Sequence, residues 1–157
     1  MSYRFEEQLD RVRRFLVRIH DTERARRDYE DDLWSFFQNC WHLKDWIKND
    51  PGVPSSVSSA IEGDVKKCES LMICADLANR SKHLDLHDAR RDADMPGRHI
   101  VAVVNETSGA DKPSHTTSAV SWDYRITLRD GSERRAMVVA EQAIADWETL
   151  IDNWKLY

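Results

Sequence analysis

The amino-acid sequence predicts an α+β fold that is mainly helical, with a four-helix bundle-like core and an inserted three-stranded antiparallel β-sheet. Apolar residues recur at helical spacing over most of the first 83 positions and again near the C-terminus. Between these regions, over about 99–138, the pattern changes to the alternation that is typical of strands. The chain has 157 residues, of which 41% are hydrophobic. This length and composition predict a single domain over 1–157.

The first two helices are expected over about 2–20 and 22–49. Asp21 or Thr22 is a suitable N-cap for the second helix. That helix should end at Asn49-Asp50-Pro51-Gly52, because proline and glycine both disfavour its continuation. The residues that form the two predicted apolar stripes are Phe5, Leu9, Val12, Leu16 and Ile19 in the first helix, and Tyr29, Leu33, Phe36, Cys40, Leu43 and Ile47 in the second.

The third helix is expected over about 55–83, with a serine after Pro54 as its N-cap, and the fourth over about 140–154. Residues 85–98 are polar and lack a sustained period, which favours an ordered loop or a frayed helix extension. The predicted apolar faces comprise Val57, Ile61, Val65, Cys68, Met72 and Ala75 in the third helix, and Ile144, Trp147, Leu150, Ile151 and Trp154 in the fourth.

The predicted sheet has strands over 100–104, 120–128 and 134–138. The second strand shows the clearest alternation, with Val120, Trp122 and Tyr124 on the same face as Ile126 and Leu128. The dipeptide Asp-Gly at 130–131 is typical of a tight β-hairpin and should connect the second and third strands. A long polar loop over 105–118 connects the first and second strands, and its role is open.

Composition excludes several classes of protein. A net charge of −5 argues against a chain that coats nucleic acid through overall positive charge. The three cysteines, Cys40, Cys68 and Cys74, include no Cys-x-x-Cys pair, so we expect them in the core. No signal peptide, transmembrane run or glycine-rich phosphate loop occurs. We therefore expect a cytoplasmic protein with no membrane partner and no cofactor.

One polar cluster near the end of the third predicted helix stands out. Asp76, Asn79, Arg80 and His83 are spaced so that they project from one side of a helix, next to its apolar stripe. Polar groups in such a place need partners, so the cluster indicates either a buried polar network or a cleft. A structural explanation also exists, because Arg80, Lys82 and His83 would complement the dipole at a helix C-terminus.

A helical bundle with an Arg–His element late in one helix resembles the HEPN superfamily. Here that element is Arg80 and His83, with Asn79 and Lys82 beside them, and only Ser81 and Lys82 separate the arginine from the histidine. This separation is shorter than is usual in the family. The resemblance implies a metal-independent endoribonuclease, or an RNA- or nucleotide-binding protein, that usually acts as a dimer.

The resemblance also implies roles for individual residues. His83 would be the general base for a ribose 2′-hydroxyl, or the acid that protonates the leaving oxygen. Arg80 would stabilise charge on the reacting phosphate, and Asn79 would orient His83 or that phosphate. Lys82 and Asp76 would assist in binding the substrate.

Two other functions are compatible with the sequence. In the first, the polar cluster is a buried network and the chain is a non-enzymatic protein–protein interaction module. In the second, His42, Asp45, His83 and His87 form a metal site between helices, although a surface His42–Asp45 pair is the simpler explanation and we expect no metal. The second helix also carries Trp34 and Trp41 away from its main stripe, which predicts a homodimer interface there.

Overall fold

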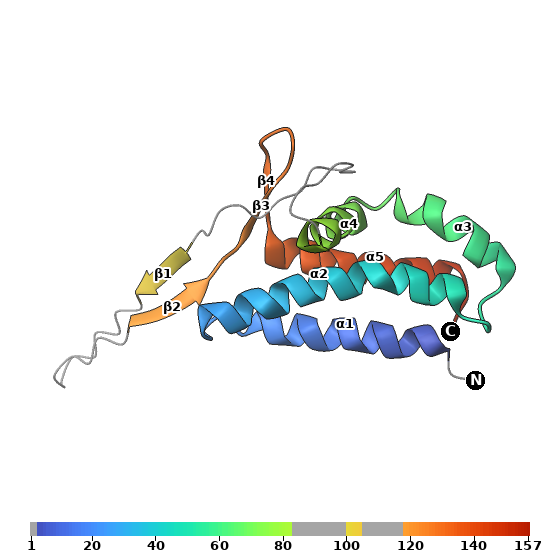
Figure 1. The fold of residues 1–157 in the computed structure, drawn as a ribbon, viewed down its shortest axis with the longest axis horizontal. Coiled ribbons are helices and arrows are strands. Elements are labelled where there is room, and N and C mark those ends of the chain that lie inside the picture. The colour runs from blue at the N-terminus through green and yellow to red at the C-terminus, as the bar shows by residue number, and fades with distance from the viewer. Residues whose placement is uncertain (1–2, 83–99, 105–117) are drawn as a thin grey trace.

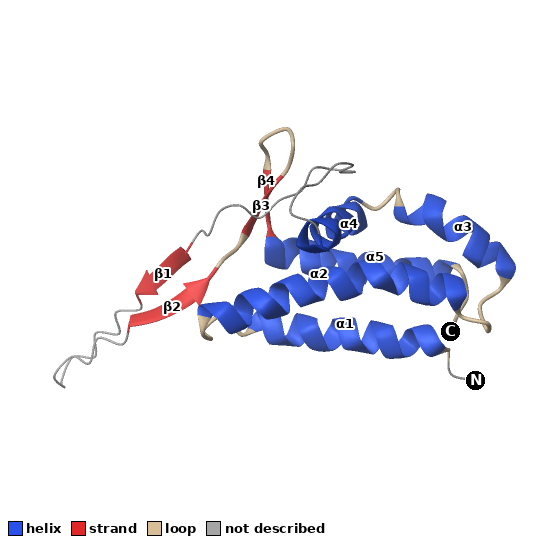
Figure 2. Ribbon diagram, in the orientation of Figure 1, coloured by secondary structure: helices blue, strands red, loops and turns tan. Residues whose placement is uncertain are grey.

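The computed structural model describes residues 3–82, 100–104 and 118–157, with side chains for 3–80 and 122–157. The described part is mainly helical (Figures 1 and 2). Its helices are α1 (Arg4–His20), α2 (Arg26–Asn49), α3 (Ser55–Val65), α4 (Glu69–Lys82) and α5 (Ala136–Asn153). Its strands are β1 (Ile100–Val104), β2 (Ser118–Trp122), β3 (Arg125–Thr127) and β4 (Glu133–Arg135).

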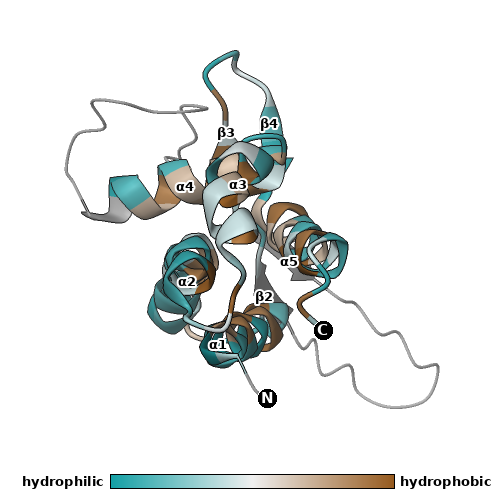
Figure 3. Cartoon of the chain, turned by 90° about the vertical axis from the view of Figure 1, so that its right-hand side faces the viewer, coloured by the Kyte–Doolittle hydropathy of each residue, from teal (hydrophilic) through white to brown (hydrophobic). Residues whose placement is uncertain are grey.

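Helices α1, α2 and α5 lie side by side, and α4 crosses α2 and α5 (Figures 1 and 3). The apolar sides of α1, α2 and α5 face one another, which places the core between these helices (Figure 3). Every predicted stripe residue of α2 is buried, and so is every predicted stripe residue of α1 except Leu16, which is partly buried. The helical periodicity therefore identified the core correctly.

The N-terminus of α1 is stabilised by a residue from the end of α2. The buried carboxylate of Asp50 accepts a hydrogen bond from the backbone N–H of Phe5 at 3.0 Å and another from that of Gly52 at 2.9 Å. The first N–H groups of a helix lack partners within the helix, so this carboxylate takes the role of a cap. It fixes the start of α1 against the turn that follows α2.

The predicted third helix, 55–83, is two helices in the structure. Helix α3 ends at Val65 and α4 starts at Glu69, with Lys67 N–H donating to Asp64 O (3.2 Å) and Cys68 N–H donating to Val65 O (3.1 Å) in the turn. The indole N–H of Trp154 also donates to Asp64 Oδ2 at 3.0 Å, which fixes the turn to the end of α5. The apolar spacing continues through the break, so periodicity alone could not reveal it.

The predicted three-stranded sheet is not formed by the described residues. Instead, β1 pairs with β2, and β3 pairs with β4, as two separate two-stranded antiparallel ribbons. The expected strand 120–128 is interrupted after Trp122, whose backbone N–H donates to Thr22 O (3.1 Å) and whose indole donates to Arg24 O (2.7 Å). These bonds attach the end of β2 to the α1–α2 connection. The two halves of the expected strand therefore belong to different ribbons.

The β3–β4 hairpin confirms the turn that the sequence predicted. Leu128 N–H donates to Ser132 O at 2.8 Å, and Gly131 adopts a φ of 82°, which favours glycine. Tyr124, Ile126 and Leu128 are buried, as their alternation predicted. The predicted strand 134–138 was wrong beyond Arg135, because Ala136, Val139, Ala140 and Ala143 are buried at helical spacing and belong to α5.

Several predicted helix ends also differ from the structure. The N-cap positions of α2 and α3 are Ala25 and Pro54, and neither makes a side-chain capping hydrogen bond. The predicted caps, Asp21 or Thr22 for α2 and a serine for α3, do not occupy these positions. The predictions for the segments 85–98 and 105–118 concern residues that lie almost entirely outside the described ranges. None of the helices in the described part is both long enough and apolar enough to cross a bilayer.

Candidate functional site

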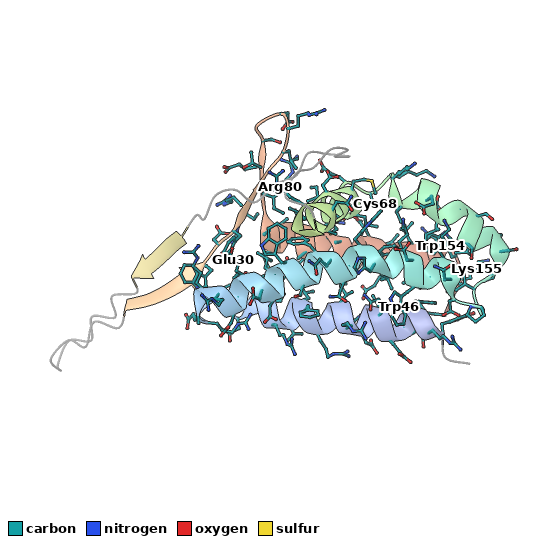
Figure 4. The ribbon with its side chains drawn as sticks, viewed as in Figure 1. Glu30, Trp46, Cys68, Arg80, Trp154 and Lys155 are labelled. Carbon is teal, nitrogen blue, oxygen red and sulfur yellow. The ribbon has the colours of Figure 1, made fainter. Side chains whose placement is uncertain are left out.

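The second half of α4 carries the polar cluster that the sequence singled out. All residues from Ser70 to Ala78 are buried, so the helix is enclosed on every side over two turns. Asn79 and Arg80 then emerge as half-buried side chains at the end of the helix. Figure 4 shows Arg80 and Cys68 on opposite sides of α4. The helix thus places a polar pair at the boundary between the core and the surface.

Asp76 is fully buried, with 0% of its surface exposed. It lies one helical turn before Arg80, a spacing at which a carboxylate and a guanidinium can meet on one helix face. Both residues have interaction partners in the structure. Burying a carboxylate without a partner would lower the free energy of unfolding by an amount on the order of several kcal/mol. We therefore interpret Asp76 as part of a polar network and not as part of an open binding surface. The prediction that Asp76 assists in binding a substrate stays a prediction.

The structure brings together three of the predicted site residues, Asp76, Asn79 and Arg80, on consecutive turns of α4. Lys82 is the last residue of α4, and its side chain lies outside the described ones. His83 and His87 fall outside the described residues as well. The prediction that His83 completes the cluster therefore stays a prediction.

The other predicted metal ligands lie on the surface of α2. His42 and Asp45 are both exposed, and Asp45 lies 3.6 Å from the Lys44 ammonium. Among residues 3–82, 100–104 and 118–157, no group of three or more His, Cys, Asp or Glu side chains is arranged to hold a metal ion. His42 and Asp45 are therefore surface residues in the structure, which agrees with the simpler of the two explanations given for them.

The two tryptophans of α2 have different environments. Trp41 is only 8% exposed, and the Lys44 ammonium lies 4.6 Å from the centre of its ring. Its burial within its own chain removes it from the predicted dimer interface. Trp34 is half-buried and lines a surface hollow of about 560 Å³. The other described residues that line this hollow are Arg26, Arg27, Glu30 and Asp31.

A second hollow, of about 400 Å³, lies between the first turn of α4 and α5. Within it the Ser70 hydroxyl donates to Asp146 Oδ2, and the Gln142 amide donates to Asp146 Oδ1 at 2.9 Å. Sequence reasoning did not find this group, because Ser70 is far from Gln142 and Asp146 in the chain. The only local signal was that Gln142 and Asp146 are four residues apart on a predicted helix.

Cys68 lines the same hollow but is a poor nucleophile there. Partial burial raises the pKa of its thiol, and the nearby carboxylates of Asp146 and Asp64 raise it further. The thiolate is the reactive form of cysteine, so these surroundings keep the side chain protonated and unreactive at neutral pH. The hollow therefore contains hydrogen-bonded polar groups without an activated nucleophile.

The chain was compared with protein-family models, with curated protein sequences and with solved structures, and none of the three comparisons gives a match.

Proposed function

We propose that this chain is a HEPN-like, metal-independent endoribonuclease of the cytoplasm, with its site at the C-terminal end of α4. The proposal is supported mainly by the arrangement of three residues of α4. Asp76 is buried, and Asn79 and Arg80 follow it as half-buried side chains near the end of the helix. A guanidinium at such a boundary has reduced contact with water, which strengthens its attraction to a phosphate.

The proposed mechanism uses the ribose 2′-hydroxyl as the nucleophile. His83 takes the proton from this hydroxyl, or donates a proton to the departing 5′-oxygen, and Arg80 stabilises the charge that develops on the phosphate. Asn79 orients His83 or the phosphate, and Lys82 assists in binding. Asp76 is a positioning residue, because its carboxylate is buried one turn before Arg80.

The direct test is cleavage of labelled single-stranded RNA in the presence of EDTA. We expect His83→Ala to lower the rate by about 10²–10⁴-fold and Arg80→Ala by about 10²–10³-fold, because they remove proton transfer and charge stabilisation respectively. Arg14→Ala, which changes an exposed arginine of α1, is the matched control and should cleave like the wild type. RNA with 2′-O-methyl groups should resist cleavage, because it lacks the nucleophile.

A non-enzymatic interaction module is the second candidate, and the complete burial of Asp76 favours it. In that case the cluster stabilises α4, and its polar groups have no substrate. Asp76→Asn separates the two functions, since it keeps the shape of the side chain and removes its charge. If the chain is an enzyme, the folded variant loses cleavage activity; if it is an interaction module, only the stability changes and the wild type cleaves no RNA.

A homodimer formed through α2 is part of the proposal, and Trp34 is the aromatic residue of the predicted interface that keeps an exposed surface. Sedimentation of the wild type and of Trp34→Ala tests this part. A dimer that dissociates in the variant supports the interface. A monomeric wild type at tens of micromolar would contradict it.

A further inference from the structure

The hollow between the first turn of α4 and α5 is built around one carboxylate. Asp146 Oδ2 accepts a hydrogen bond from the Ser70 hydroxyl, and Asp146 Oδ1 accepts one from the Gln142 amide at 2.9 Å. Ser70 is only 6% exposed, so its hydroxyl and the carboxylate hold each other in place. Cys68, which also lines the hollow, and Arg80 lie on opposite sides of α4 (Figure 4). The hollow is therefore separate from the proposed ribonuclease site.

The other charges around the hollow are balanced within the described part of the chain. Lys67 Nζ lies 3.2 Å from Asp64 Oδ1, and Arg134 Nη2 lies 3.6 Å from Glu69 Oε1. These two ion pairs leave Asp146 as the one lining charge that forms no ion pair with a described side chain. The hollow thus has a negative charge at its polar centre.

The Cys68 thiol is affected by this charge. Partial burial is the main cause that raises the pKa of Cys68, and the Asp146 carboxylate is the next, ahead of Asp64 and of the opposing Lys67. Asp146 is therefore the strongest charge acting on this side chain of the hollow. A negative potential in a partly enclosed space favours a cationic ligand.

The polar groups of the hollow favour one kind of cation. After the two hydrogen bonds have formed, the acceptors that remain are the Ser70 hydroxyl oxygen, further lone pairs of Asp146 and the Gln142 side-chain oxygen. A primary ammonium has three N–H donors, which match these three groups. A guanidinium prefers parallel bonds to both oxygens of one carboxylate, and each oxygen of Asp146 already accepts a bond from the protein. A primary ammonium therefore fits better than a guanidinium.

Part of the lining is apolar. Ile73 and Val139 are buried, whereas Val138 is 50% exposed. An aliphatic chain attached to the ammonium would cover Val138 and remove apolar surface from water. The volume of the hollow, about 400 Å³, lies within the range of small-ligand sites.

We propose that this hollow is a binding site for a primary alkylammonium group. The ammonium donates hydrogen bonds to Ser70, Asp146 and Gln142, and the alkyl chain lies on Val138. Two sources offer this chemistry, a free aliphatic amine and a lysine side chain of another protein. The site requires neither RNA nor the C-terminal end of α4, so its test is independent of the proposed ribonuclease activity.

NMR titration of the isotope-labelled full chain tests the proposal. We expect n-butylammonium to shift the backbone amide signals of residues 68–73 and 138–146, with a Kd in the millimolar range that so small a ligand allows. Butyltrimethylammonium, which has no N–H donor, should bind at least about tenfold more weakly, and so should butylguanidinium. Each methylene removed from the alkylammonium should weaken binding roughly three- to fourfold.

Two variants change the site itself. Asp146→Asn should weaken n-butylammonium binding at least about tenfold because it removes the charge, and Asp152→Asn is the control at an exposed carboxylate of the same helix. Val138→Ser should reduce the dependence of binding on chain length, and Val17→Ser is the control at an exposed valine of α1. Since Val138 is half exposed, we expect its replacement to leave the fold intact, so this variant tests the site even if Asp146→Asn is unstable.

Nα-acetyl-lysine amide distinguishes the two sources. Binding as tight as that of n-butylammonium would indicate a lysine side chain, whereas clearly weaker binding would indicate a free amine, and both results support an alkylammonium site. Three results would overturn the proposal: no shift at about 100 mM n-butylammonium, equal binding of butyltrimethylammonium, or binding like that of the wild type by both Asp146→Asn and Val138→Ser.

Discussion

A single buried side chain, Tyr29, connects the helices to the β3–β4 hairpin. Its ring is 2% exposed and stacks on Tyr124, with ring centres 5.7 Å apart and an interplanar angle of 23°. Burial raises the pKa of Tyr29 to about 12, and the neighbouring Tyr124 and Asp123 act in the same direction. The phenol therefore stays neutral in the folded protein at a pH where it ionises in the unfolded chain.

This difference predicts a loss of stability at alkaline pH. Below the ordinary pKa of 10 the phenol is protonated in both states, so its contribution to stability is complete. Between pH 10 and about 12 the unfolded chain releases the proton and the folded chain does not, which costs about 1 kcal/mol of stability per pH unit. Urea unfolding across this range should show a steeper loss for the wild type than for Tyr29→Phe.

Tyr157→Phe is the matched control, because that side chain is exposed. It should leave the slope of stability against pH as in the wild type. Equal slopes for the wild type and Tyr29→Phe would show that Tyr29 ionises equally in the folded and unfolded states.

Asp64 provides a second test on a single residue, at acidic pH. The hydrogen bond from the Trp154 indole lowers the pKa of Asp64, and Lys67 lowers it further. The lowered pKa contributes stability above the ordinary value of 3.8, and this contribution is lost as the pH falls through the folded-state pKa. We expect Trp154→Phe to raise the pKa of Asp64, as measured by NMR titration, and to cost about 1 kcal/mol at neutral pH.

Trp46→Phe controls for the loss of an indole at a half-buried position on α2. It should leave the titration of Asp64 unchanged. If Trp154→Phe also leaves it unchanged, the Trp154–Asp64 hydrogen bond does not contribute to the charge state of Asp64.

At the level of elements, periodicity predicted most of the helical core but neither the break in 55–83 nor the pairing of the strands. The stripe of Val65, Cys68 and Met72 continues through the α3–α4 turn, and a contact that attaches this turn to the end of α5 comes from Trp154, far along the chain. The alternation over 120–128 likewise continues through a point where Trp122 bonds to the α1–α2 connection. Local sequence does not encode these long-range contacts, so pattern analysis could not find them.

Helix α3 contains a glycine that the fold does not require. A Cβ atom added at Gly63 would meet nothing within 4 Å, and the residue lies in the last turns of α3. Alanine restricts the unfolded chain more than glycine does, so Gly63→Ala should raise the free energy of unfolding by roughly 0.5–1 kcal/mol. Urea unfolding measures the change.

Gly131→Ala is the matched comparison in the β3–β4 turn. There φ is 82°, a conformation that costs an L-residue roughly 1–2 kcal/mol, so this variant should be less stable. A loss of stability in Gly63→Ala would mean that α3 needs a glycine in its last turns for a reason other than space.

At the scale of the whole molecule, one core unites the five described helices with the β3–β4 hairpin, and α4 is the most enclosed of these helices. The sequence predicted which polar residues share a side of that helix. It did not predict their depth, and Asp76 is fully buried. The hollow with Ser70 and Asp146 was not predicted either, since α4 and α5 meet only in the folded chain.

We propose that the end of α4 is a ribonuclease site, and one experiment tests this proposal directly. The most direct measurement is cleavage of single-stranded RNA in EDTA by the wild type, Arg80→Ala, His83→Ala and the control Arg14→Ala, with circular dichroism showing that all four are folded. We expect cleavage by the wild type and Arg14→Ala, and a loss of at least about 10²-fold in the other two. Equal cleavage by all four proteins, or none by the folded wild type, would contradict it.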